Sequence, residues 1–133
     1  MSQEVCVFEY DRSHNILIVA PRGNITEFRD SDIRDAYNNT YREITQEHVR
    51  HLLIDFSEMS YFGSTFVGIL IRLAKKIRLD GGEAVLCCLS DNMRDMLKTL
   101  MLLENTKTDF FWVPFDSREE AVAFLEQKSE SPA

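Results

Sequence analysis

Gly63, Ser64 and Thr65 stand between a loop and the most apolar stretch of the chain, where the residue spacing predicts that a helix begins. A serine hydroxyl at a helix start accepts hydrogen bonds from free backbone amides, and most such serines are ordinary helix caps. The same amides and the helix dipole also stabilise a phosphate group. The position of Ser64 therefore suits an ordinary helix cap and is also one at which a phosphate would be stabilised.

Asp55 is another residue whose position suits chemistry, because it ends a run that is predicted to be a buried strand. Open α/β folds place their sites at the carboxyl ends of their strands. An aspartate there accepts a phosphate only if two further carboxylates hold Mg²⁺ beside it. Glu9 and Asp11 are the nearest carboxylates in the pattern, but they lead into a predicted hairpin, so a phosphoaspartate site is a minor alternative.

Enzyme and metal motifs are weak. His48 and His51 are three residues apart, which suits one helical turn, but no third ligand accompanies them. Glycine-rich loops of the types that cradle nucleotide phosphates are absent from the sequence, and residue order alone identifies no Ser/His/Asp set. We expect no catalytic residues, no metal and no cofactor, and a small-ligand binder or an enzyme of unrecognised type is the least favoured alternative.

The three cysteines, Cys6, Cys87 and Cys88, all lie in apolar, strand-like stretches. Neighbouring residues of a strand point to opposite faces, so Cys87 and Cys88 are not expected to share a metal ion. We expect reduced, buried thiols, as is usual in cytoplasmic proteins.

The chain of 133 residues carries 15 basic and 22 acidic residues, a net charge of -7. That sign argues against general affinity for nucleic acid and for anionic membranes. The sequence has no apolar run near the roughly 18 residues of a membrane-spanning helix and no secretory signal, so we expect a cytoplasmic protein without membrane insertion. The length suits one domain, which we assign to residues 1–127, followed by a polar tail at 128–133. The oligomeric state stays open.

Strands and helices are expected to alternate after an initial hairpin. Strands are predicted at residues 5–10, 16–20, 52–56, 84–89 and 110–115, with a turn at 11–15. Helices are predicted from Asp30 to Ile44, from Ser64 to the glycines at 81–82, after Ser90 and after Ser117. The order β-β-α-β-α-β-α-β-α predicts an α/β fold with a mixed, mostly parallel sheet of about five strands, one antiparallel edge strand and four helices. The second helix should bury Leu70, Leu73 and Ile77 against the sheet.

The stretch from Leu52 to Ile77, LLIDFSEMSYFGSTFVGILIRLAKKI, resembles the signature of the STAS domain, the fold of bacterial anti-sigma factor antagonists. The family pattern is an apolar strand, Asp-Leu or Asp-Phe, a loop, and Asp-Ser-Ser/Thr-Gly-Leu-Gly at the start of an apolar helix. Ser64 matches the regulatory phosphoserine, Thr65 the following hydroxyl residue and Gly68 the second glycine. The stretch ILIVAPRGNIT and the stretch from Met93 to Leu125 extend the resemblance to nearly the whole chain.

The resemblance implies a single STAS-like domain that is not an enzyme but a regulatory protein-interaction module. Its partners would be a serine kinase that also acts as an anti-sigma factor, and a phosphatase. Phosphorylation of Ser64, the first candidate, would switch the interaction off, and Thr65 is the second choice of acceptor. The resemblance places the partner-binding residues after the second strand and at the start of the second helix: Gly23, Asn24, Thr26, Gly63, Ser64, Thr65 and Phe66.

Two positions depart from the family pattern, because Gly63 replaces the usual Asp and Phe66 replaces the usual Gly. A ring at Phe66 either packs into the core or guards the site. The alternative function is therefore a STAS scaffold whose Ser64 is not phosphorylated, as a subunit of a signalling complex or of a transporter.

Overall fold

The β-branched and apolar runs form one five-stranded sheet in the part of the chain that the structure, a computed structural model, describes: residues 8–22, 30–46, 48–59, 64–100, 102–103 and 112–130, with the backbone alone at 30, 64, 65, 129 and 130. The strand order is β1-β2-β3-β4-β5. The strands are β1 (Phe8–Ser13), β2 (Ile16–Pro21), β3 (His51–Asp55), β4 (Ala84–Cys87) and β5 (Val113–Phe115). β1 is antiparallel to β2, and β2 to β5 are parallel to one another, as predicted.

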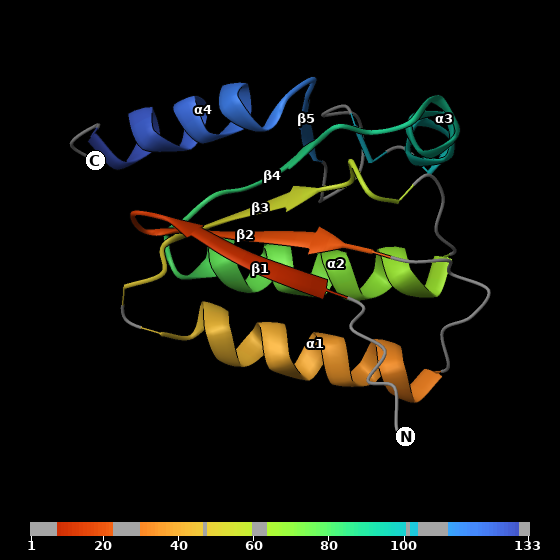
Figure 1. Cartoon of the computed structure of the whole chain (residues 1–133), viewed down its shortest axis with the longest axis horizontal. Helices are drawn as coiled ribbons and strands as arrows, with labels where there is room; N and C mark the ends of the chain where they lie inside the picture. The colour runs from red at the N-terminus through yellow and green to blue at the C-terminus, as the bar shows by residue number, and fades with distance from the viewer. Residues whose placement is uncertain are drawn as a thin grey trace.

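Within the described residues, four helices pack around the sheet: α1 (Asp30–Ile44), α2 (Ser64–Leu79), α3 (Asp91–Thr99) and α4 (Arg118–Glu130). Figure 1 shows α1 and α2 below the sheet and α4 above it, with α3 at the end toward which the arrowheads of β2 and β3 point. Two of the predicted caps are present, since Ser90 Oγ accepts from the Met93 amide at 3.2 Å and Ser117 Oγ accepts from the Glu120 amide at 3.2 Å. The predicted element order is confirmed.

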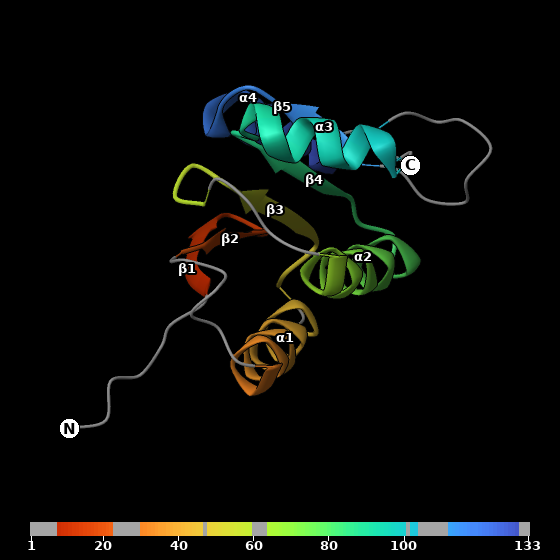
Figure 2. The same cartoon turned by 90° about the vertical axis from the view of Figure 1, so that its right-hand side faces the viewer.

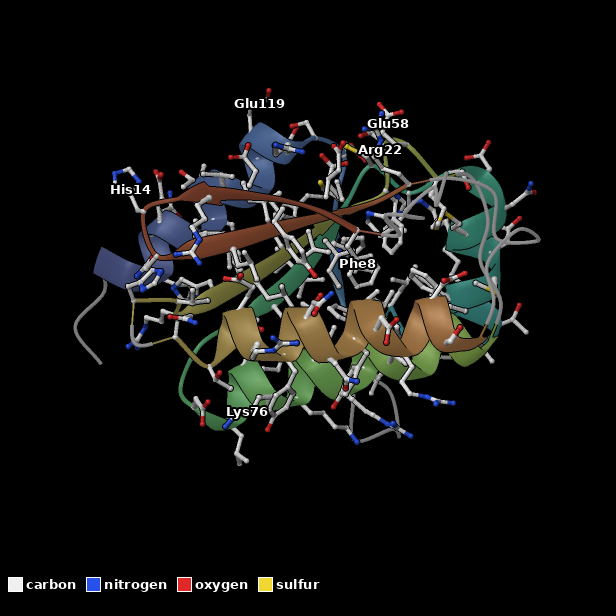
Figure 3. The ribbon with its side chains drawn as sticks, turned by 60° about the horizontal axis from the view of Figure 1, so that its bottom comes forward. Phe8, His14, Arg22, Glu58, Lys76 and Glu119 are labelled. Carbon is white, nitrogen blue, oxygen red and sulfur yellow. The ribbon has the colours of Figure 1, made fainter. Side chains whose placement is uncertain are left out.

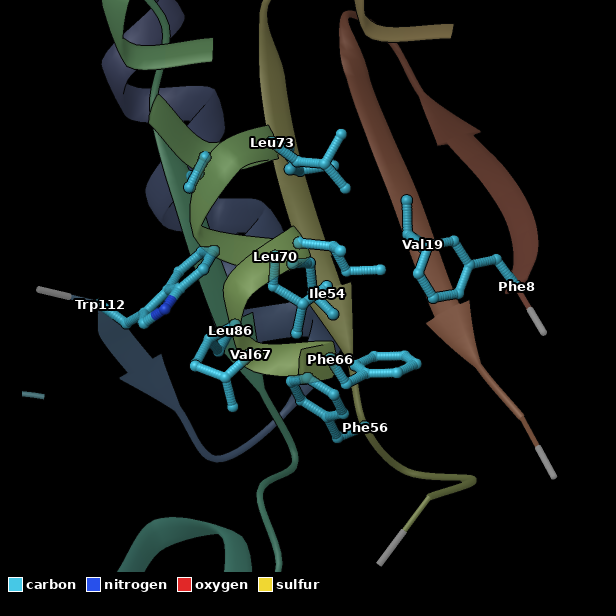
Figure 4. Close-up of a cluster of buried hydrophobic side chains, with 14 of the residues drawn as sticks. Phe8, Val19, Ile54, Phe56, Phe66, Val67, Leu70, Leu73, Leu86 and Trp112 are labelled. Atoms are coloured by element: carbon cyan, nitrogen blue, oxygen red, sulfur yellow. The ribbon is translucent and has the colours of Figure 1, made fainter. Parts of the chain in front are cut away.

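The larger part of the core lies between the sheet and α1 and α2. The predicted stripe of α2 is confirmed, with Leu70, Leu73 and Ile77 only 2%, 1% and 2% exposed. Figure 4 shows Leu70 and Leu73 of α2 on the side of the sheet that carries Ile54 of β3 and Leu86 of β4. The other face of the sheet is covered by α4, whose Ala121 and Leu125 are fully buried. A central strand buried on both faces needs apolar residues at successive positions, which explains the LLI run of β3.

Several predicted strand boundaries were wrong, and β3 runs from His51 to Asp55 where 52–56 was expected. Residues 11–13 continue β1, so the hairpin turn is only His14–Asn15, with His14 in the left-handed region at φ 56°. β4 ends at Cys87, because Cys88 has φ 63° and leaves the strand. Trp112 lies before β5, although it was expected inside that strand. Outside the described residues lie the predicted strand positions 5–7, which include Cys6, and positions 110 and 111. Pro114 lies in β5, an edge strand, as its missing donor requires.

His51 provides a pH-dependent contribution to stability at the other end of the sheet. Its side chain is 2% exposed, and its Nδ1 accepts a hydrogen bond from the Glu83 amide at 3.0 Å, which requires a neutral ring. Burial, and to a lesser extent the charge of Arg50, lower the pKa of His51 below 6.5. Because the unfolded chain then binds the proton more tightly, this contribution is complete above pH 6.5 and is lost as the pH falls below it.

We therefore expect the free energy of unfolding to fall by up to about 1.4 kcal/mol per pH unit just below pH 6.5, where the carboxylates are still ionised. The His51→Asn variant keeps an acceptor but cannot titrate, so its stability should change less over the same interval. Urea denaturation of both proteins at about pH 7.5 and about pH 5.5 measures the difference. Parallel pH profiles for the two proteins would show that His51 contributes no such term.

Candidate functional site

The carboxyl edge of the parallel strands is where the chain passes from β3 to α2. β2 ends at Pro21 and β3 at Asp55, and α2 begins at Ser64 on this same side, as Figure 1 shows. Figure 2 looks onto this edge. In Figure 3 the side chains of Arg22 and Glu58 lie at this end, and that of His14 lies at the opposite, hairpin end. The sheet topology therefore brings the ends of β2 and β3 and the start of α2 to one edge.

Asp55 is held rigidly at this edge, with 3% of its surface exposed. Its Oδ1 accepts from the Ser57 amide at 2.9 Å, and its Oδ2 accepts from Arg118 Nε at 2.8 Å. Burial by itself would raise the pKa of Asp55, but the hydrogen bonds from Ser57 and Arg118 together outweigh it and hold that pKa below its ordinary value. Asp55 is therefore an ionised carboxylate that fixes the turn after β3 to the start of α4.

The phosphoaspartate alternative loses its cation site in this arrangement. Asp11 Oδ2 accepts from Arg118 Nη1 at 3.3 Å, and Glu9 forms an ion pair with Arg22. Both carboxylates that were considered as Mg²⁺ ligands are thus neutralised by arginines, and an arginine also occupies Oδ2 of Asp55. The geometry therefore disfavours Asp55 as a phosphate acceptor.

The predicted histidine pair is not brought together as a metal site either. His51 is buried and its Nδ1 already accepts from the Glu83 amide, whereas His48 is exposed. Among the described residues, the group whose ligand atoms converge is a different one, Asp55, Cys87 and Cys88.

Ser64 is the first residue of α2, with Thr65 after it, so both backbones are helical and their side chains are outside the described atoms. The first turn of α2 contains no acidic residue, whereas α3 has Asp91 there and α4 has Glu119 and Glu120. Carboxylates in a first turn occupy the favourable field of the helix dipole. The start of α2 therefore leaves that field free for an added negative charge.

Phe66 packs into the core and does not guard the surface. Its side chain is 1% exposed, and its ring meets that of Phe8 edge to face, with centroids 5.7 Å apart and planes at 80°. Figure 4 shows the ring of Phe66 between those of Phe8 and Phe56. Although Phe66 was expected among the partner-binding residues, its buried ring offers no contact surface. It anchors the first turn of α2 to the sheet.

Gly68 has no packing role within the described chain. It is exposed on α2, and a Cβ built on it meets no atom within 4 Å. The remaining predicted partner-binding residues, Gly23, Asn24, Thr26 and Gly63, lie outside the described residues.

Arg118 is the residue at this edge of the sheet that sequence reasoning missed. It pairs with Asp55, 63 positions earlier, and with Asp11, 107 positions earlier. Its sequence signal was its place directly after the helix cap Ser117, since a residue at the start of α4 must lie at the carboxyl edge of the parallel strands.

The chain belongs to the STAS domain family, whose model matches residues 8–121. The fold is similar to that of an anti-sigma-factor antagonist (STAS) domain protein from Planctomyces limnophilus, with a TM-score of 0.73, 19% sequence identity, and coverage of 90% of this chain and 97% of that one. It is similar to the anti-sigma factor antagonist SpoIIAA in its unphosphorylated form, with a TM-score of 0.72, 15% identity, and coverage of 90% and 96%. A serine-to-glutamate variant of RsbS from Moorella thermoacetica has a TM-score of 0.74, 16% identity, and coverage of 93% and 98%.

The chain thus resembles anti-sigma factor antagonists over nearly its whole length. Among the helices of the described residues, none combines the length and the hydropathy that crossing a bilayer demands.

Proposed function

We propose that this protein is a non-enzymatic, cytoplasmic regulatory module that binds a serine kinase acting as an anti-sigma factor, and that phosphorylation of Ser64 switches the interaction off. The observation that carries the proposal is the position of Ser64 as the first residue of α2, at the carboxyl edge of the sheet, in a chain of the STAS family. A phosphatase would restore the active form.

Charge explains how such a switch works. Phosphate on Ser64 adds about 1.5 to 2 negative charges, and the free amides at the start of α2 tolerate them locally. The fold need not change, because the first turn is anchored by the buried ring of Phe66. The phosphate instead destabilises the complex, because it must lose its hydration there and it places negative charge against the partner. Gly68, exposed and without a packing role, leaves room for a partner to approach α2 closely.

We expect Ser64→Asp to weaken binding to the kinase by at least about tenfold, and Ser64→Ala to bind as the wild type does but to resist phosphorylation. Isothermal titration of each protein against a candidate serine kinase from its own organism measures binding, and incubation with that kinase and ATP measures phosphorylation. Ser13→Asp is the matched control, because it adds the same charge at the hairpin end of the sheet. Equal binding of Ser64→Asp and wild type would exclude the switch.

Stability must be measured in parallel, since Ser64→Ala removes a possible cap worth about 0.5 to 2 kcal/mol. A second candidate function, a STAS scaffold subunit of a signalling complex or of a transporter, is favoured by the departures at Gly63 and Phe66. It predicts that the partner binds Ser64→Asp and wild type alike and transfers no phosphate.

A further inference from the structure

Cys87 and Cys88 have an arrangement that a regular strand cannot produce. Cys87 is the last residue of β4 and is fully buried, and Cys88 follows it with φ 63°. In a continuous strand the two side chains would point to opposite faces of the sheet. The left-handed turn at Cys88 instead brings both sulfur atoms and a carboxylate oxygen of Asp55 to within 4.8 Å of one another.

The expectation that these two side chains point to opposite faces of one strand was therefore wrong. The left-handed region is unfavourable for a residue with a Cβ, and strain of this kind concentrates at functional sites. It is stabilised here by β5, because the Cys88 amide donates to the Phe115 carbonyl at 3.1 Å. The backbone of β4 and β5 thus holds the two thiols on one side.

Asp55 is also oriented as a ligand would be. Its Oδ1 accepts from the Ser57 amide and its Oδ2 accepts from Arg118 Nε, so the carboxylate is held in one orientation. Hydrogen bonds of this kind orient ligating carboxylates in known metal sites. Arg118 contacts the carboxylate from the start of α4, so it would act as a positioning residue.

We propose that Asp55, Cys87 and Cys88 form a binding site for a thiophilic divalent cation of the Zn²⁺ type. Thiolates select such ions over Mg²⁺ and Ca²⁺, and two sulfurs with one carboxylate leave a fourth, tetrahedral position for water or another ligand. Binding deprotonates both thiols and forms two metal–sulfur bonds. The two released protons balance the charge of the ion, and the Asp55–Arg118 pair stays neutral. The half-buried Cys88 gives the ion access.

The test is a titration of the full chain with Cd²⁺ in the presence of a phosphine reductant, followed by the ultraviolet sulfur-to-metal charge-transfer band, and a repeat with Zn²⁺ against a chromogenic chelator. We expect one ion per chain and release of about two protons per ion. Cys88→Ser should lose the band. Arg118→Gln should weaken binding by about 10- to 100-fold, as loss of a ligand-orienting partner does.

Cys6→Ser is the matched control, because it removes the third thiol and should leave the band unchanged. Cys88→Ser is the decisive variant, since Cys87 is fully buried and its replacement endangers folding; circular dichroism verifies the fold of each protein. Wild-type protein that binds Cd²⁺ no more tightly than Cys88→Ser, or a band that depends on Cys6, would overturn the site. Neither result bears on the Ser64 switch.

Discussion

Replacing Phe66 by alanine is expected to lower the free energy of unfolding by about 3 to 5 kcal/mol. The ring is 1% exposed and lies edge to face against Phe8, so its removal leaves a cavity between the first turn of α2 and the sheet. The aromatic pair adds about 0.5 to 1.5 kcal/mol beyond the buried area. Urea denaturation followed by circular dichroism measures the loss.

Phe66→Leu is the control, since it keeps most of the volume and should cost much less than alanine. Phe66→Gly restores the residue that the family usually has here, and it should be more destabilising than Phe66→Ala because glycine is about 1 kcal/mol less favourable than alanine within a helix. A loss below about 1 kcal/mol for Phe66→Ala would mean that the ring lies at the surface as a guard of the site.

Replacing Leu73 by alanine is expected to cost about 2 to 5 kcal/mol. The side chain is 1% exposed and belongs to the stripe of α2 that packs lengthwise on the sheet, as Figure 4 shows. The neighbouring Arg72→Ala provides the comparison, because Arg72 is exposed on the same helix and should change stability by less than about 0.5 kcal/mol. A loss of stability under about 0.5 kcal/mol for Leu73→Ala would contradict the packing, because it would mean that Leu73 does not face the sheet.

Local pattern was enough to predict most of the fold. The apolar stripe of α2, the caps at Ser90 and Ser117 and the edge position of Pro114 each follow from residues within a few positions of one another. These signals depend only on a short segment, so they predict its structure without knowledge of the tertiary fold. Alternation of strands with helices then determined the parallel sheet.

The side-chain contacts at the carboxyl edge of the sheet could not be predicted in the same way. Asp55 and Arg118 meet across 63 positions, and only the completed sheet brings them together. Cys88 was expected to extend β4, because an apolar run contains no sign of a left-handed residue that is not glycine. The sequence left two positions open for the ring of Phe66, one in the core and one at the surface of the site. Its packing against Phe8 of β1 shows that the ring lies in the core.

The most direct test of the proposed switch is the intact mass of the protein isolated from its own cells, with mapping of any phosphate by peptide fragmentation. The proposal predicts a population heavier by one phosphate, with that phosphate on Ser64, and no such population for Ser64→Ala expressed in the same cells. A protein that is unphosphorylated under all growth conditions, or phosphorylated on a residue other than Ser64, would contradict the switch and leave the STAS scaffold in its place.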